Sequence, residues 1–149
     1  MSNKSLYGEQ IIYLSKHPKN FRAIENAQYK CEGANPLCGD RVTVYVNVGP
    51  DETLEDVAFQ GAGCAICMAS ASMMTTSVKG RKRAEAEQLF EEFHRLVKGE
   101  LDPAREAHHL GKLTMFENVS HYPVRVKCAS LPWHALHNAL ESQPAASTE

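Results

Sequence analysis

The clearest pattern of hydrophobic and polar positions lies in the first third of the chain. Valines occupy every second position from 42 to 48, and Thr43, Tyr45 and Asn47 stand between them. This alternation predicts a strand with one buried face. The turn sequence GPDE at 49–52 and the following stretch 54–60 predict a second strand, which pairs back as an antiparallel hairpin. A further short strand is expected within 27–33.

Apolar residues at spacings of three and four predict helices on both sides of these strands. The first covers about 5–15 and ends before Pro18, because the residue preceding a proline avoids the helical region. Residues 64–80 are small, sulfur-rich and almost uncharged, which predicts a helix buried on most sides. Another helix ends at Gly99, a short one is expected within 100–120, Pro123 marks a bend, and a last one covers about 129–141.

The order of one helix, then strands, then helices indicates an α+β fold. We expect a small antiparallel three-stranded sheet packed against several helices. A chain of 149 residues is long enough for one domain with a sizeable core, which we place at 1–141. The segment 142–149, SQPAASTE, has the composition of a disordered tail.

Composition narrows the classes of partner. Hydrophobic residues make up 43% and charged residues 23% of the chain, and the formal net charge is −2, so we expect neither nucleic acid nor a membrane as partner. The first residues lack the apolar run of a signal peptide, and no apolar stretch is long enough to span a bilayer. A cytoplasmic location is therefore expected.

The chain has five cysteines, an odd number. Without an export signal, this count argues against a disulfide framework. In a reducing compartment a cysteine is a buried filler, a metal ligand or a reactive thiol. Buried filler is the default interpretation for each one taken alone, and we expect it for Cys31.

Four residues of metal-ligand type fall at the ends of predicted elements. Cys38 and Asp40 lie in the turn before the valine strand, Cys64 follows the second strand of the hairpin, and Cys128 precedes the last helix. Antiparallel pairing brings the start of one strand beside the end of the other, so Cys38 and Cys64 should be close. A helix N-terminus favours a thiolate over a thiol, and Cys64 and Cys128 each lie at the start of a predicted helix. Three thiolates and one carboxylate can hold zinc or iron.

Such a site would carry a net negative charge even with a divalent ion bound. Arg41, Arg125 and Lys127 flank the ligands in sequence and could offset it. A carboxylate is a harder ligand than sulfur, and structural zinc sites normally close with cysteine and histidine. We therefore interpret Asp40 as a labile ligand that keeps the site exchangeable, and the hypothesis predicts that Asp40→Ala lengthens the lifetime of a bound iron–sulfur cluster.

Three stretches that contain these residues also carry a resemblance. NPLCGD at 35–40, FQGAGCAICMASAS at 59–72 and PVRVKCASLPWHAL at 123–136 resemble the signature stretches of the iron–sulfur scaffold family of the NifU amino-terminal, IscU and SufU type. HPKNF at 17–21 is similar to a further segment of that family. The resemblance implies the SufE/NifU-like fold and a ligand set of Cys38, Asp40, Cys64 and Cys128.

The resemblance extends to one branch of the family. Lys127 stands where IscU-type members have a histidine, and the long stretch between Gly80 and Cys128 resembles an insertion of SufU-type members. The SufU branch implies zinc at the four ligands and sulfur from a pyridoxal-phosphate cysteine desulfurase of the SufS type. It implies that the desulfurase supplies a replacement ligand, which frees Cys38 to accept the persulfide. A transient 2Fe–2S cluster or iron, and downstream iron–sulfur acceptor or Suf scaffold proteins, are also implied.

Two other functions stay open at this stage. The chain could be a structural zinc module that only binds a partner. Cys64 and Cys67 form a C-x-x-C at a helix start, which is typical of dithiol oxidoreductases, although no βαβ pattern precedes it. A small buried side chain is the favoured interpretation of Cys67. The basic run 79–83 indicates either a solvated face or a docking site for an acidic partner.

Overall fold

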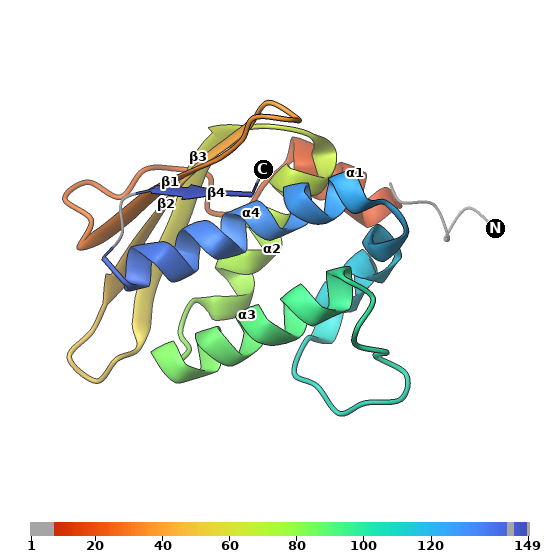
Figure 1. The fold of residues 1–149 in the computed structure, drawn as a ribbon. Helices are drawn as coiled ribbons and strands as arrows, with labels where there is room; N and C mark the ends of the chain where they lie inside the picture. Colours follow the sequence, from red (N-terminus) through yellow and green to blue (C-terminus); the bar gives the residue numbers. More distant parts are fainter. Residues whose placement is uncertain (1–7, 143–144, 149) are drawn as a thin grey trace.

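A computed structural model describes residues 8–142 and 145–148 of the chain (Figure 1). The helices and strands, in chain order, are α1 (Glu9–Lys16), β1 (Tyr29–Asn35), β2 (Asp40–Val48), β3 (Leu54–Ala62), α2 (Ala65–Val78), α3 (Arg83–Val97), the 3-10 helix η2 (Gly111–His121), α4 (Pro123–Leu140) and β4 (Ala145–Ser147). The predicted α+β class is confirmed. Residues 5–7 of the first predicted helix lie outside the described residues.

The sheet has four strands in the order β3-β2-β1-β4. β1, β2 and β3 pair antiparallel as predicted, but β4 pairs parallel to β1, so the prediction of a three-stranded antiparallel sheet is wrong. β4 falls within the segment 142–149, for which we predicted disorder; residues 143–144 and 149 lie outside the described residues. The alanines and serine of β4 show no hydrophobic pattern. Backbone hydrogen bonds hold β4 at the edge of β1, and the amide of the following residue, Thr148, donates to the Ala34 carbonyl.

The predicted hairpin of β2 and β3 is confirmed. Arg41 pairs with Ala62 at one end, and Val48 pairs with Leu54 at the other. The start of β2 and the end of β3 therefore lie side by side at one edge of the sheet. The turns that carry Cys38 and Cys64 leave the sheet at this edge.

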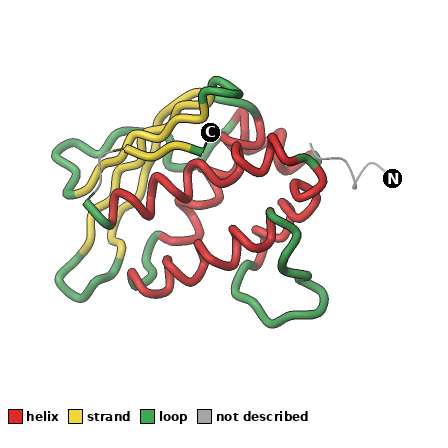
Figure 2. The backbone as a smooth tube through the Cα atoms, in the orientation of Figure 1, coloured by secondary structure: helices red, strands yellow, loops and turns green. Residues whose placement is uncertain are grey.

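Helices cover one face of the sheet (Figures 1 and 2). α4 packs on β1 and β2, α2 packs on β3, and α3 with η2 forms an outer layer against α4. The Ser70 hydroxyl of α2 donates a 2.6 Å hydrogen bond to the Ala129 carbonyl of α4, which ties the two inner helices together. Within the described part of the chain, no helix has the length and hydrophobicity needed to cross a membrane.

Helix α4 begins earlier than the sequence indicated. Pro123 occupies its first turn, a position that suits proline because the missing N–H has no helical partner there. The prediction that Pro123 marks a bend and that the helix starts at about 129 is therefore wrong. Cys128 consequently lies inside the helix rather than before it, and the prediction that Cys128 sits at a helix N-terminus is wrong.

Candidate metal centre

A tight turn between β1 and β2 presents two of the predicted ligands. The Cys38 amide donates a 3.2 Å hydrogen bond to the Asn35 carbonyl. Gly39 has a φ of +72°, a left-handed conformation that glycine adopts without steric cost. This conformation lets Cys38, which is half-buried, and Asp40, which is 1% exposed, serve the same site from neighbouring positions.

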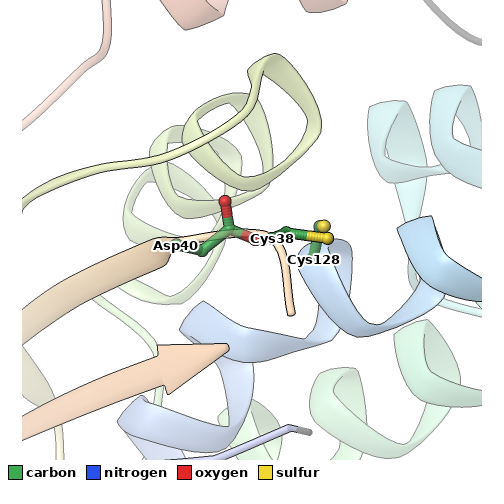
Figure 3. A group of neighbouring side chains, drawn as sticks. All are labelled: Cys38, Asp40 and Cys128. Atoms are coloured by element: carbon green, nitrogen blue, oxygen red, sulfur yellow. The ribbon is translucent and has the colours of Figure 1, made fainter. Parts of the chain in front are cut away.

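Cys128 joins these two residues from α4. One ligand atom from each of Cys38, Asp40 and Cys128 lies within 4.8 Å of the others, and we call this group the Cys38–Asp40–Cys128 triad. Figure 3 shows the two sulfur atoms side by side, with the carboxylate next to them. Residues far apart in the sequence thus converge at the end of the sheet where β2 starts and β3 ends.

Cys64, the N-cap residue of α2 and the fourth predicted ligand, is not part of this group but contacts two of its members. Its backbone N–H donates a 2.9 Å hydrogen bond to Asp40 Oδ1. Its thiol hydrogen-bonds with Cys128, and mainly for this reason the pKa of Cys64 is lowered to about 6. The pKa of Cys128 is raised, first by the same hydrogen bond and then by burial. The interaction therefore favours the thiolate at Cys64 and the thiol at Cys128.

The glycine before Cys64 makes room for the carboxylate. A Cβ atom on Gly63 would lie 2.6 Å from Asp40 Oδ1, closer than any side chain tolerates. The absence of a side chain at this position allows Asp40 to sit against the start of α2. A negative charge is favourable there because backbone amides and the helix dipole point at it.

Two further residues contact the sulfurs. Arg125 Nη1 lies 3.8 Å from Cys128 Sγ and 4.0 Å from Cys38 Sγ, as expected for a cation that offsets the charge of the site. Asn35 was missed by the sequence analysis: it is fully buried, and its Nδ2 lies 3.5 Å from Asp40 Oδ2 and 3.7 Å from Cys128 Sγ. The only signal for Asn35 was its place at the start of NPLCGD.

The other two cysteines are buried. Cys67 follows Cys64 in the first turn of α2 and is 0% exposed, and burial is the main cause that raises its pKa. Cys31 lies on β1, also 0% exposed, with its pKa raised by burial to about 11. Both agree with the interpretation as buried side chains. All five cysteines are free thiols.

The basic run 79–83 is engaged within the chain. Lys79, Lys82 and Arg83 form ion pairs with Asp56, Asp51 and Glu141, respectively. Arg81 Nε donates to the Ser77 carbonyl at 2.8 Å. These contacts favour the interpretation of the run as a solvated, internally paired face.

Comparison with known proteins places this geometry in a family. The sequence model of the NifU-like N terminal domain matches residues 6–143. The chain belongs to this family. The resemblance inferred from the three cysteine-containing stretches is thereby confirmed.

Two related proteins align with most of this chain. The chain is 35% identical to the zinc-dependent sulfurtransferase SufU of Bacillus subtilis, over 93% of this chain and 92% of that protein. It is also 35% identical to the iron–sulfur cluster assembly scaffold protein IscU of Streptococcus pyogenes, over 91% of this chain and 83% of that protein.

Solved structures agree with the fold. The crystal structure of FiSufU from Fervidobacterium islandicum superimposes with a TM-score of 0.82 and 38% identity, covering 91% of this chain and 96% of FiSufU. A NifU-like protein from Brucella abortus reaches a TM-score of 0.83 at 22% identity, covering 92% of this chain and 93% of that one, which supports the fold alone.

Proposed function

We propose that this chain is an iron–sulfur cluster assembly protein of the SufU type, which accepts sulfur from a pyridoxal-phosphate cysteine desulfurase. The convergence of Cys38, Asp40 and Cys128 within 4.8 Å is the observation that carries the proposal. Family membership and the similarity to the SufU and IscU relatives support it. The recipients would be downstream iron–sulfur acceptors or Suf scaffold proteins in the cytoplasm, where free thiols persist.

The residues present fit zinc. Zinc takes cysteine sulfur at about 2.3 Å and carboxylate oxygen at about 2.0–2.2 Å, so tetrahedral sulfur ligands stand roughly 3.8 Å apart. The triad needs only a small contraction to reach this spacing. Cys64 would complete the set of four, and Arg125 would offset the charge. Bound zinc would keep the sulfurs deprotonated at neutral pH, and a 2Fe–2S cluster or iron would be held as transient cargo by the same side chains.

Cys38 is the sulfur acceptor in this proposal because it is the accessible member of the triad. Asp40 and Cys128 are buried, whereas Cys38 is half-buried and follows Leu37, which is 68% exposed. The Cys38 thiolate attacks the outer sulfur of the desulfurase persulfide. The sulfur–sulfur bond breaks, the desulfurase cysteine leaves as a thiolate, and Cys38 carries the new persulfide.

The test is stimulation of a SufS-type cysteine desulfurase, measured as alanine released from cysteine under reducing conditions. The wild-type chain should stimulate turnover, and Cys38→Ala should abolish the stimulation. Cys31→Ala, which removes a buried thiol on β1, should retain it. Undiminished stimulation by Cys38→Ala would contradict the proposal, and unfolding on zinc chelation without any effect on the desulfurase would favour a structural zinc module instead.

A further inference from the structure

The proposed ligand set leaves Cys67 without a role, although Cys67 lies one helical turn from Cys64. Cys64 is the half-buried N-cap of α2, and Cys67 is the buried third residue of the helix. The backbone N–H of Cys67 hydrogen-bonds with the Cys64 thiol. The Cys64 sulfur therefore lies over the turn that carries Cys67.

This geometry suits a disulfide between the two residues. Residues three apart face the same side of a helix, and a disulfide requires Cα atoms about 4.4–6.8 Å apart, which one helical turn satisfies. Closing the short loop between them costs little chain entropy compared with linking separate elements. A C-x-x-C at a helix start is the arrangement in which dithiol redox sites are built.

We propose that Cys64 and Cys67 are an oxidant-sensitive dithiol that closes to a disulfide on reaction with hydrogen peroxide. Closure would bond the Cys64 sulfur to Cys67, away from the triad, and so disassemble the four-ligand site. The disassembly of the site rests on the proposed function, whereas the formation of the disulfide does not.

The chemistry balances with peroxide as the only co-reactant. The Cys64 thiolate attacks one peroxide oxygen, the O–O bond breaks, and the departing hydroxide takes up a proton as water. The Cys67 sulfur then attacks the resulting sulfenic acid at Cys64, loses its proton, and expels the hydroxyl group as a second water. Two thiols are oxidised and one peroxide is reduced. Peroxide meets Cys64 first because Cys67 is 0% exposed, which makes Cys67 the resolving thiol.

Tryptic mapping of the full chain tests the pairing directly. The metal-free protein is treated with hydrogen peroxide, its remaining thiols are alkylated, and it is digested with trypsin. Cleavage after Arg41 and Lys79 yields the peptide 42–79, whose cysteines are Cys64 and Cys67. A disulfide internal to this peptide is expected. Cross-links from 42–79 to peptide 31–41, which carries Cys31 and Cys38, or to peptide 128–149, which carries Cys128, would overturn the proposal.

Matched variants separate the disulfide from general oxidation. In Cys67→Ser the peptide 42–79 should show sulfenic or sulfinic acid at Cys64 in place of the disulfide. Cys31→Ser removes a cysteine of equal burial on β1 and should form the disulfide as wild type does. If Cys67→Ser and wild type accumulate the sulfinic acid at the same rate, the resolving role of Cys67 is wrong.

Zinc release distinguishes this proposal from the proposed function. Zinc-loaded wild type should release its metal on oxidation, several-fold faster than Cys67→Ser, and rebind it after reduction with a dithiol. If the disulfide forms without loss of zinc, the redox proposal is supported, but Cys64 is not a zinc ligand. If zinc stays bound and no disulfide forms at any peroxide concentration, the redox proposal is wrong, and the proposed ligand set is unaffected.

Discussion

The backbone N–H of Cys64 donates a 2.9 Å hydrogen bond to Oδ1 of Asp40, which joins the first residue of β2 to the start of α2. Oδ2 of the same carboxylate faces Asn35 Nδ2 at 3.5 Å. Asp40 is thus both a candidate ligand and a structural link between two elements. Replacing Asp40 should therefore have two effects that can be measured separately, one on the chemistry of the site and one on the stability of the fold.

Asp40→Ala is predicted to lengthen the lifetime of a reconstituted iron–sulfur cluster. On the labile-ligand hypothesis, this variant lacks the oxygen ligand through which a bound cluster would be released. The free energy of unfolding should fall by about 1–3 kcal/mol, because the part-buried Cys64 N–H loses its acceptor. Decay of the visible absorbance of the cluster and urea unfolding measure the two effects.

Asp40→Asn is the matched control, since its amide oxygen can still accept from Cys64 N while it is a poorer ligand than a carboxylate. It should retain more of the unfolding free energy than Asp40→Ala. Faster cluster loss from Asp40→Ala than from wild type would show that the carboxylate is an anchor, and the labile-ligand hypothesis would then be wrong.

Cys128→Ala is predicted to raise the pKa of Cys64 in the metal-free chain. The hydrogen bond with Cys128 is the largest cause that lowers this pKa to about 6, ahead of the opposing effect of burial. Without Cys128, the midpoint should move up toward the usual cysteine value of about 8.5. The rate of iodoacetamide labelling of Cys64 against pH, followed in the peptide 42–79, gives the midpoint for each protein. An unchanged midpoint would mean that the helix amides alone hold the thiolate.

The placement of the Cys38 and Cys64 turns at the same end of the β2–β3 hairpin could be predicted from the sequence because a strand has a side-chain period of two. The alternating valines fix which face of β2 is buried, and burial on one face fixes its register with β3. The pairing of Arg41 with Ala62 follows from that register. No knowledge of other proteins was needed to place the two turns at one edge of the sheet.

Other features depend on contacts that leave no local pattern. β4 consists of two alanines and a serine whose position is set by the free edge of β1, so its sequence alone predicts a disordered tail. Pro123 suits a bend and a helix start equally, and its role is settled only by the packing of α4 on the sheet. Asn35 is recognised as part of the site only when Asp40 and Cys128 surround it.

Phe93→Ala is predicted to lower the free energy of unfolding by about 3–5 kcal/mol, the usual cost of deleting a buried aromatic ring. The Phe93 ring is stacked on Trp133 at 4.9 Å and meets Phe116 edge-on at 5.5 Å, between α3, α4 and η2. Trp133 is the only tryptophan, so its fluorescence in urea reports on this layer. Val124→Ala, at a side chain 54% exposed, should change the value by no more than about 0.5 kcal/mol. Equal losses in both variants would contradict the placement of Phe93 in the core.

A group of histidines lies between α3 and α4, next to Phe90. His94 and His134 meet edge-on at 5.3 Å, and His137 Nδ1 lies 2.8 Å from Glu87 Oε2. Burial lowers the pKa of His134, and the nearby His94 and His137 lower it further. Burial also lowers the pKa of His94, followed by Lys98, with Glu100 acting against both. The folded state therefore favours neutral imidazoles at these two positions.

Acidification should destabilise the fold through this group. A histidine whose pKa is lowered by folding contributes its full stabilisation above the unfolded pKa of about 6.5, and the contribution is lost as pH falls toward the lower, folded pKa. His134→Leu removes one such group, so its unfolding free energy should decline less than that of wild type between pH 7 and pH 5. His121→Gln, at an exposed position on η2, should retain the wild-type decline. Urea unfolding at the two pH values measures the difference, and parallel declines in His134→Leu and wild type would show that other groups cause the acid sensitivity.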